Sequence, residues 1–192
     1  MARYRRYTKT IVRAPRKRWN VVNDNYHSES TQYGGSFSYV GTMVYNSDDN
    51  AQPTPVILKC KNATIYGSLS IRNNQAAGDQ NPLFVMSYVV YVPEIVYTTI
   101  EDLASATDLF PFCEKLLDDH PEWIMSAKNV NLQYNGEVGE RATVRWTQTT
   151  RKMKRNLKSG DRLMMFIMVR FIGTATLFAE MYCESKVNTC AN

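Results

Sequence analysis

An alternation of apolar and polar residues with a period of two recurs through most of the chain after residue 35. It is clearest in residues 141–149, where Ala142, Val144 and Trp146 occupy even positions and the intervening positions hold Arg or Thr. A helix would repeat its apolar face every 3.6 residues, so this spacing is typical of strands with one buried face. Turn residues such as Asn135-Gly136 and Ser159-Gly160 separate the segments. The pattern therefore predicts an all-β sandwich or barrel.

The alternating segments number about eight and are interrupted once by a helical pattern. Residues 99–119 carry that pattern, with a capping-box form at Thr98–Glu101 and a break at Pro111. We expect one short helix before Pro111 and a second from Pro111 to Asp119, with Leu116 and Leu117 facing inward. Within residues 56–71 the apolar positions switch from even to odd, which predicts a bulge at residues 61–64. The expected fold is a single eight-stranded antiparallel jelly roll over residues 31–192, with a short helical insertion. The expected strands are residues 36–45, 56–71, 84–92, 123–134, 141–149 and 152–157, followed by two closing strands.

Positive charge is concentrated at the N-terminus. Eight of the 23 Lys and Arg residues lie in the first 18 positions, which leaves 15 against 18 acids elsewhere, and the first acid is Asp24. Such a segment has too little apolar surface to order itself, and its like charges repel, so residues 1–30 are predicted to be a flexible basic arm that seeks a polyanion.

Aromatic residues among these cations favour nucleic acid as the polyanion. Tyr4, Tyr7 and Trp19 offer rings that stack on unpaired bases, at roughly 1–3 kcal/mol for each base. A solubilising tail or a membrane-surface tail is the alternative, but the rings do not form the apolar helical face that a membrane-lying helix needs. The predicted nucleic-acid contacts of the arm are Arg3, Arg5, Arg6, Lys9, Arg13, Arg16, Lys17, Arg18 and Trp19.

A second basic cluster spans residues 151–162, with Asp161 as its only acid. On a strand, Lys152, Lys154 and Asn156 would share one face, and Arg155 and Leu157 the other. A face turned to the same side as the arm would extend a non-specific phosphate-binding surface. The equally simple alternative is a solvated sheet edge that Lys and Arg protect from aggregation. The residues predicted to contact nucleic acid here are Lys152, Lys154, Arg155 and Lys158.

The chain carries no recognisable catalytic or metal-binding motif. It lacks a phosphate-binding glycine loop, a G-x-S-x-G elbow and an H-E-x-x-H pair, and its acid pairs are explained by solvation or helix ends. Its four cysteines and two histidines lack metal-ligand spacing, and no signal-peptide pattern begins the chain, so we expect reduced thiols, no cofactor, no metal and no enzymatic activity. The apolar run at residues 163–179 is interrupted by Arg170 and Gly173-Thr174, which favours two adjacent strands over a membrane span.

Several stretches resemble the capsid proteins of small circular single-stranded DNA viruses, the circovirus and nanovirus-like group. They are the MARYRRY start, the triplet Arg16-Lys17-Arg18, the VILKCKNATIYGSLSIRN segment, and KRNLKSGD followed by an apolar strand at Arg155–Arg170. The arm is shorter and less Arg-rich than in circovirus capsids. The coat proteins of satellite RNA plant viruses are similar in size and layout.

The resemblance implies a single jelly roll, a T=1 icosahedral shell of sixty copies, and arms inside the shell on a single-stranded DNA genome. It also implies nuclear import through Arg16, Lys17 and Arg18 by a host import receptor, and a place in the virion and the host nucleus. Binding would neutralise phosphates without reading sequence, because no base-reading element is present. The alternatives are a coat protein of a small RNA satellite virus and a cellular single-strand-binding β protein; a nuclear regulator would need that base-reading element.

Overall fold

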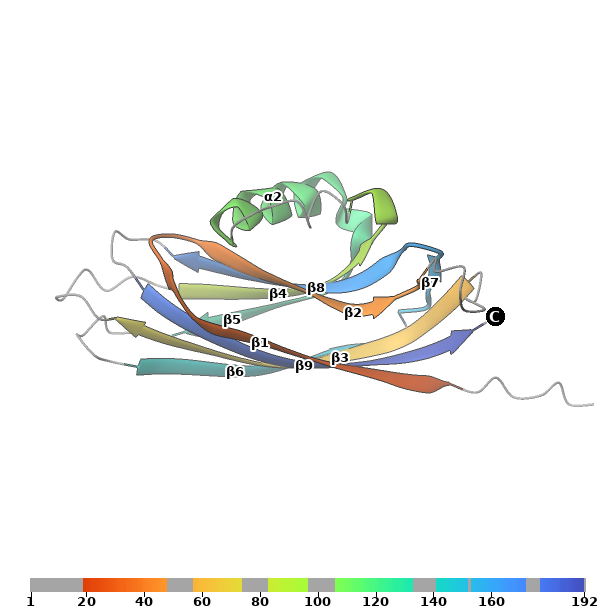
Figure 1. Ribbon diagram of the computed structural model, residues 1–192, viewed down its shortest axis with the longest axis horizontal. Coiled ribbons are helices and arrows are strands. Elements are labelled where there is room, and N and C mark those ends of the chain that lie inside the picture. The colour runs from red at the N-terminus through yellow and green to blue at the C-terminus, as the bar shows by residue number, and fades with distance from the viewer. Residues whose placement is uncertain are drawn as a thin grey trace, which may run out of the picture.

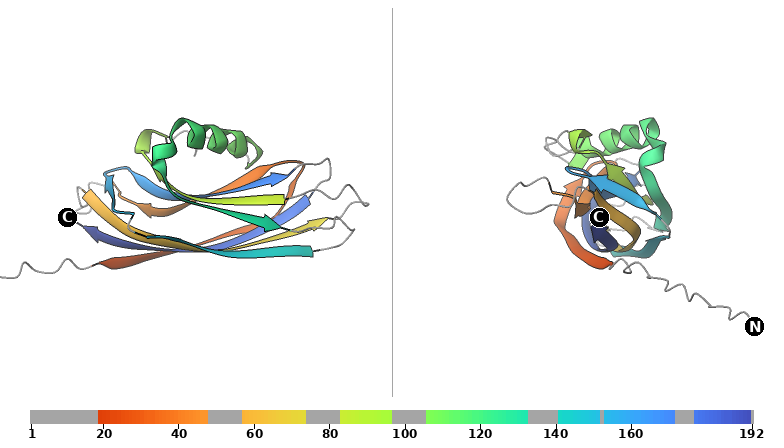
Figure 2. Two further views of the ribbon diagram at one scale, coloured as in Figure 1. Left: turned by 180° about the vertical axis from the view of Figure 1, so that it is seen from behind. Right: turned by 90° about the vertical axis from the view of Figure 1, so that its right-hand side faces the viewer.

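The computed structural model describes residues 19–47, 57–73, 83–96, 106–132, 141–151, 153–171 and 177–191. Two antiparallel sheets pack face to face, and one helix covers the outer side of one of them (Figures 1 and 2). The first sheet has the order β1-β9-β3-β6, with β7 also paired to β3, and the second has the order β2-β8-β4-β5. The strands of the first sheet are β1 (Asn20–Tyr33), β9 (Leu177–Ala191), β3 (Ile57–Asn73), β6 (Arg141–Thr150) and β7 (Arg155–Lys158). Those of the second are β2 (Phe37–Tyr45), β8 (Arg162–Phe171), β4 (Leu83–Val92) and β5 (Ile124–Leu132).

The strand order confirms the predicted jelly roll. When β7 is set aside, four strands form each sheet, and the chain crosses repeatedly between the two sheets. The expected set of eight had counted β7 and omitted β1. Residues 20–30, assigned from the sequence to the basic arm, form most of β1 and pair with β9 from Asn20–Thr189 onward. This strand is rich in Asn, Ser and Asp and lies at a sheet edge, so backbone pairing rather than apolar alternation holds it in place.

The predicted bulge in β3 is confirmed. The register of β3 against β9 shifts between Cys60 and Asn62, and the buried positions change from Cys60 to Ala63 and Ile65. The apolar run at residues 163–179 belongs to two strands, β8 and β9, as expected. Within the described ranges, no helix is long and apolar enough to cross a membrane.

The helical insertion differs from the prediction at Pro111. Helix α2 (Ala106–Asp119) is continuous and contains Pro111, where the sequence had predicted one helix to end and another to begin. Proline removes one backbone hydrogen bond, but its φ suits a helix, and apolar packing of the same helix offsets the loss. Leu116 and Leu117 are buried, as predicted, with Phe110 and Cys113, against Met164, Phe166 and Met168 of β8. The capping box at residues 98–101 lies outside the described residues.

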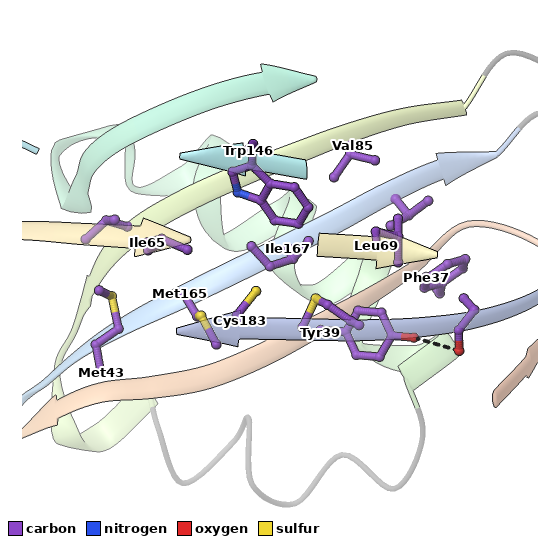
Figure 3. Close-up of a cluster of buried hydrophobic side chains, with 14 of the residues drawn as sticks. Phe37, Tyr39, Met43, Ile65, Leu69, Val85, Trp146, Met165, Ile167 and Cys183 are labelled. Carbon is purple, nitrogen blue, oxygen red and sulfur yellow. Dashed lines mark hydrogen bonds between the residues drawn. The ribbon is translucent and has the colours of Figure 1, made fainter. Parts of the chain in front are cut away.

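The main core fills the space between the two sheets (Figure 3). Trp146 of β6 pairs with Gly67 of β3, and a side chain at position 67 would collide with the Trp146 ring. The ring therefore uses the space that the glycine leaves. Tyr39 is buried in the same core, and its hydroxyl donates to the Ala179 carbonyl at 3.5 Å.

Candidate nucleic-acid interface

The outer face of the first sheet, which points away from the second sheet and from α2, carries three exposed aromatic rings. Trp19, Tyr66 and Tyr182 retain 39%, 41% and 48% of their accessible surface. Tyr66 and Tyr182 come from the paired strands β3 and β9, where Tyr66 faces Glu184 and Ser68 faces Tyr182. The two residues are thus diagonal neighbours on one face, and the Cα atoms of such neighbours lie about 7–8 Å apart in antiparallel sheets.

Cations lie between and beside these rings. The Nζ of Lys61 is 5.5 Å from the centre of the Trp19 ring, and the Nζ of Lys186 is 5.3 Å from the centre of the Tyr66 ring. The Nζ of Lys186 also lies 2.8 Å from Oε1 of Glu184, and this hydrogen bond raises the pKa of Lys186. Arg72, Arg141 and Arg145 occupy outward positions of β3 and β6 on the same face. We call this set, Trp19, Lys61, Tyr66, Arg72, Arg141, Arg145, Tyr182 and Lys186, the cationic face.

A shallow concavity of about 340 Å³ lies at one end of the cationic face. The hydroxyls of Ser68, Ser70 and Thr143 line it together with Arg141, Arg145, Glu180 and Tyr182. The Oγ of Ser70 and Oγ1 of Thr143 share a hydrogen bond of 3.0 Å. The concavity thus combines cations, hydroxyl groups and one ring.

Glu180 is held from both sides in this concavity. Its Oε2 accepts a hydrogen bond from Nη2 of Arg141 at 3.2 Å, and its Oε1 lies 3.3 Å from Nε2 of His27. Arg145 has no ion pair with any residue that the structure describes. The carboxylate charge is therefore already engaged, and the Arg145 guanidinium is not.

The opposite side of the molecule is acidic. Helix α2 presents Glu114, Asp118 and Asp119 against Lys115, and η1 (Pro121–Trp123) adds Glu122. Arg170 of β8 pairs with Glu114 and neutralises part of this charge. The described part of the chain therefore separates charge: cations gather on the first sheet and carboxylates around the helix that covers the second.

Of the arm residues predicted to contact nucleic acid, only the last, Trp19, lies within the described part of the chain. Residues 1–18, with Arg3, Arg5, Arg6, Lys9, Arg13, Arg16, Lys17 and Arg18, lie outside the described residues, as does Lys152. Trp19 is described: it is exposed and lies beside Lys61 on the cationic face. Residues 1–18 are therefore joined to the sandwich at this face.

The second basic cluster divides into two environments. Lys154 has a left-handed backbone, with φ 46°, so the predicted strand alternation begins only after it. Asn156 and Lys158 of β7 are exposed, and Asn156 pairs with Lys59 on the outward side of β3. Arg155 instead turns inward, where its guanidinium carbon lies 3.7 Å from the centre of the Tyr91 ring. The structure thus leaves Lys154 and Lys158 exposed and gives Arg155 a packing contact.

The turn that follows β7 is anchored by a buried carboxylate. Asp161 accepts hydrogen bonds from the Tyr91 hydroxyl at 2.7 Å and from the Lys158 amide at 2.9 Å. Burial raises the pKa of Tyr91, and its hydrogen bond to Asp161 raises it further. Gly160 has φ 82°, a conformation that other residues adopt only with strain. The Lys-Ser-Gly-Asp stretch noted in the sequence is therefore a structural turn.

Sequence reasoning missed the cationic face itself. Its residues are polar positions of strands far apart in the chain, and only the order β9-β3-β6 brings Tyr182, Tyr66 and Arg145 side by side. The available signal was the presence of Tyr, Lys and Arg at the outward positions of residues 62–72 and 178–188. Among the described residues, no three His, Cys, Asp or Glu side chains are grouped to hold a metal ion.

Comparisons with known proteins return structural matches only: no protein-family model matches the chain, and no curated protein matches it in sequence. A chain of the VP2 subviral particle of infectious bursal disease virus matches with 10% identity and a TM-score of 0.41, over 92% of this chain and 37% of that one. This chain thus spans just over a third of its length. Desmodium yellow mottle tymovirus matches with 10% identity and a TM-score of 0.28, over 97% and 98% of the two chains. The semi-empty virus-like particle of Macrobrachium rosenbergii nodavirus matches with 8% identity and a TM-score of 0.33, over 100% and 94%.

Proposed function

We propose that this chain is the subunit of a small viral capsid whose cationic N-terminal segment binds the enclosed nucleic acid. The observation that carries the proposal is the junction at Trp19: the segment with eight cations enters a single jelly roll at a sheet face that is itself cationic and aromatic. That arrangement suits a subunit with one side toward a polyanion and the other toward solvent.

Charge neutralisation supplies the binding mechanism. Each phosphate that a Lys or Arg neutralises releases condensed counterions, so affinity falls steeply with salt and does not depend on base sequence. Sixty subunits would bring about 480 cations to the interior from residues 1–18. Many copies of a weak contact would therefore hold the genome, and no chemical step is required of the protein.

The finer assignment is a T=1 shell of sixty subunits around single-stranded DNA, with nuclear import through Arg16, Lys17 and Arg18. The sequence resemblance to the capsid proteins of small circular DNA viruses supports it, above all at Arg155–Arg170, which comprises β7, the Asp161 turn and β8 up to Arg170. Unpaired bases also suit the exposed rings of the cationic face.

Electron microscopy and sedimentation of the expressed full chain test the shell. The expected result is a closed particle of tens of subunits that protects nucleic acid from added nuclease. Extraction of the protected strand and digestion by DNase or RNase then separates a DNA genome from an RNA genome. A discrete monomer or dimer at every salt concentration and pH examined would rule out a capsid subunit.

A further inference from the structure

We infer that the folded domain binds single-stranded nucleic acid on its own surface, at the concavity where Arg145 and Arg141 contact a phosphate and Tyr182 stacks on a base. This site is separate from residues 1–18, and it deepens the proposed function, on which its biological setting rests. The argument depends on the chemistry of the concavity and on the neighbours of each side chain.

Arg145 is the primary phosphate ligand of this site. Its guanidinium offers five N–H donors in a planar fork that matches two phosphate oxygens, and no described carboxylate engages it. Arg141 lies four residues away on the same face of β6 and lines the same concavity, and its contact with Glu180 through Nη2 orients it while its other donors remain available. Both guanidinium groups therefore line the concavity, where either can contact a phosphate.

Hydroxyl groups complete the anion site. Ser68, Ser70 and Thr143 line the same concavity. One hydroxyl of the Ser70–Thr143 pair donates to the other, so Ser68 and the accepting member of the pair keep their protons for a phosphate or sugar oxygen. Glu180 opposes an anion, but its two oxygens are already engaged by Arg141 and by the ring of His27. The local balance thus favours a phosphodiester over a cation.

The exposed rings select unpaired bases. Tyr182 borders the concavity, and Tyr66 follows it diagonally along the sheet toward Lys186. A flat sheet face lets a ring stack on a base only if that base is not enclosed in a duplex. The run from Arg145 through Tyr182 and Tyr66 to Lys186 therefore fits a single strand whose backbone meets cations and whose bases meet rings.

The test measures binding of labelled oligothymidylate by fluorescence anisotropy. The protein is the unassembled full chain in which the eight Lys and Arg of residues 1–18 are Gln, so that the folded domain supplies the binding. The variants are Arg145→Gln and Tyr182→Thr, and each has a matched control. Lys115→Gln removes one exposed charge from α2, and Tyr45→Thr removes one exposed ring from β2.

Arg145→Gln is expected to reduce the magnitude of the slope of log affinity against log salt by about 0.7, the contribution of one phosphate contact on a single strand. Tyr182→Thr is expected to weaken oligothymidylate binding about 5-fold to 150-fold, the range for loss of one base stack. The same Tyr variant should bind inorganic polyphosphate and duplex DNA as tightly as its parent. Both controls should bind oligothymidylate like the parent.

Equal effects of Arg145→Gln and Lys115→Gln would overturn the site, because they would mean that only net charge matters. Equal losses of oligothymidylate and polyphosphate with Tyr182→Thr would overturn the stacking role. The two proposals fail separately. If the chain never forms shells but the Arg145 and Tyr182 variants change oligothymidylate binding as expected, only the capsid proposal is refuted. If it forms shells and both variants bind oligothymidylate like their parent, only this site is refuted.

Discussion

The Oγ of Ser87 in β4 donates a hydrogen bond of 2.6 Å to Oε1 of Gln148 in β6, which joins the two sheets inside the core. Ser87 is fully buried, and Gln148 is 3% exposed. The amide of Gln148 donates in turn to Oγ of Ser126 in β5 at 3.0 Å. Both polar ends of Gln148 are thus satisfied, and the strand that carries Arg141 and Arg145 on its outer side is fixed from within.

Replacing Ser87 by Ala should destabilise the fold by about 1–3 kcal/mol, because it leaves the buried Gln148 oxygen without a donor. Urea unfolding of the unassembled subunit measures the loss. Ser159→Ala, in an exposed turn, is the control and should change stability by no more than about 0.5 kcal/mol. The double variant Ser87→Ala with Gln148→Leu should lose less than the sum of the single changes; strict additivity would contradict the coupling.

Gly67→Ala should cost about 1–3 kcal/mol, because the new methyl group would meet the Trp146 ring and force it from its position. Urea unfolding gives the loss, and a change in the Trp146 fluorescence of the folded protein should accompany it. Gly35→Ala is the matched control, since nothing lies within 4 Å of a side chain placed there. A Gly67→Ala protein as stable as the control would show that the ring moves freely.

The stability of the fold should decline in alkali because burial raises the pKa of three of its thiols. Burial raises the pKa of Cys60 and Cys183 from 9.0 to about 12, and that of Cys113 to about 12 as well. A raised pKa means that the unfolded chain loses these protons first. The stabilisation is therefore complete below about pH 9 and falls as pH rises toward 12, by up to about 1.4 kcal/mol per pH unit for each thiol.

Denaturant unfolding at a series of pH values from 8 to 11 measures this decline. Replacing Cys60, Cys113 and Cys183 by Ala should lower stability at pH 8, through lost packing, and flatten its dependence on pH above 9. An unchanged slope in the triple variant would show that other groups, such as Tyr91, control the alkaline transition.

In the proposed capsid, neutralising the eight cations of residues 1–18 with Gln should leave shell formation intact and empty the shells of nucleic acid, because it removes the charges that would neutralise phosphates and leaves the sandwich unchanged. The absorbance ratio of purified particles at 260 and 280 nm reports the content. The control is a chain whose residues 2–18 are shuffled with their composition kept. The shuffled chain should package nucleic acid normally if charge alone acts. Empty particles from the shuffled chain would point to sequence-specific recognition.

Lys158 and Arg155 should respond differently to the same substitution. Lys158→Gln should reduce the salt dependence of oligonucleotide binding, since its amine is exposed on β7. Arg155→Gln should instead lower stability by about 1–2 kcal/mol, because it removes the stacking on Tyr91. Fluorescence anisotropy and urea unfolding of the two variants separate these effects. A reversed pattern would mean that the Arg155 guanidinium contacts the nucleic acid instead of the Tyr91 ring.

The sequence predicts the features that repeat along the chain and misses those that depend on contacts with distant strands. Alternation finds the strands, and its change of parity finds the β3 bulge, because both follow from which face is buried. Alternation does not reveal strand β1, because polar residues such as Asn and Ser occur on both of its faces and its stabilisation comes from pairing with β9. The break expected at Pro111 fails because packing of Cys113 and Leu117 on β8 outweighs one lost hydrogen bond. The cationic face needs the strand order, which no single segment encodes.

In the proposed capsid, the opposed charges of the cationic face and helix α2 would also bear on the order of events during assembly. The cationic face of one free subunit would attract helix α2 of another, and such a head-to-tail contact extends into a filament unless its rotation closes a ring. A nucleic acid that covers the cationic face removes one half of this attraction. Early binding of the genome would therefore suppress head-to-tail chains of subunits. It would favour lateral association, which can end in a closed particle.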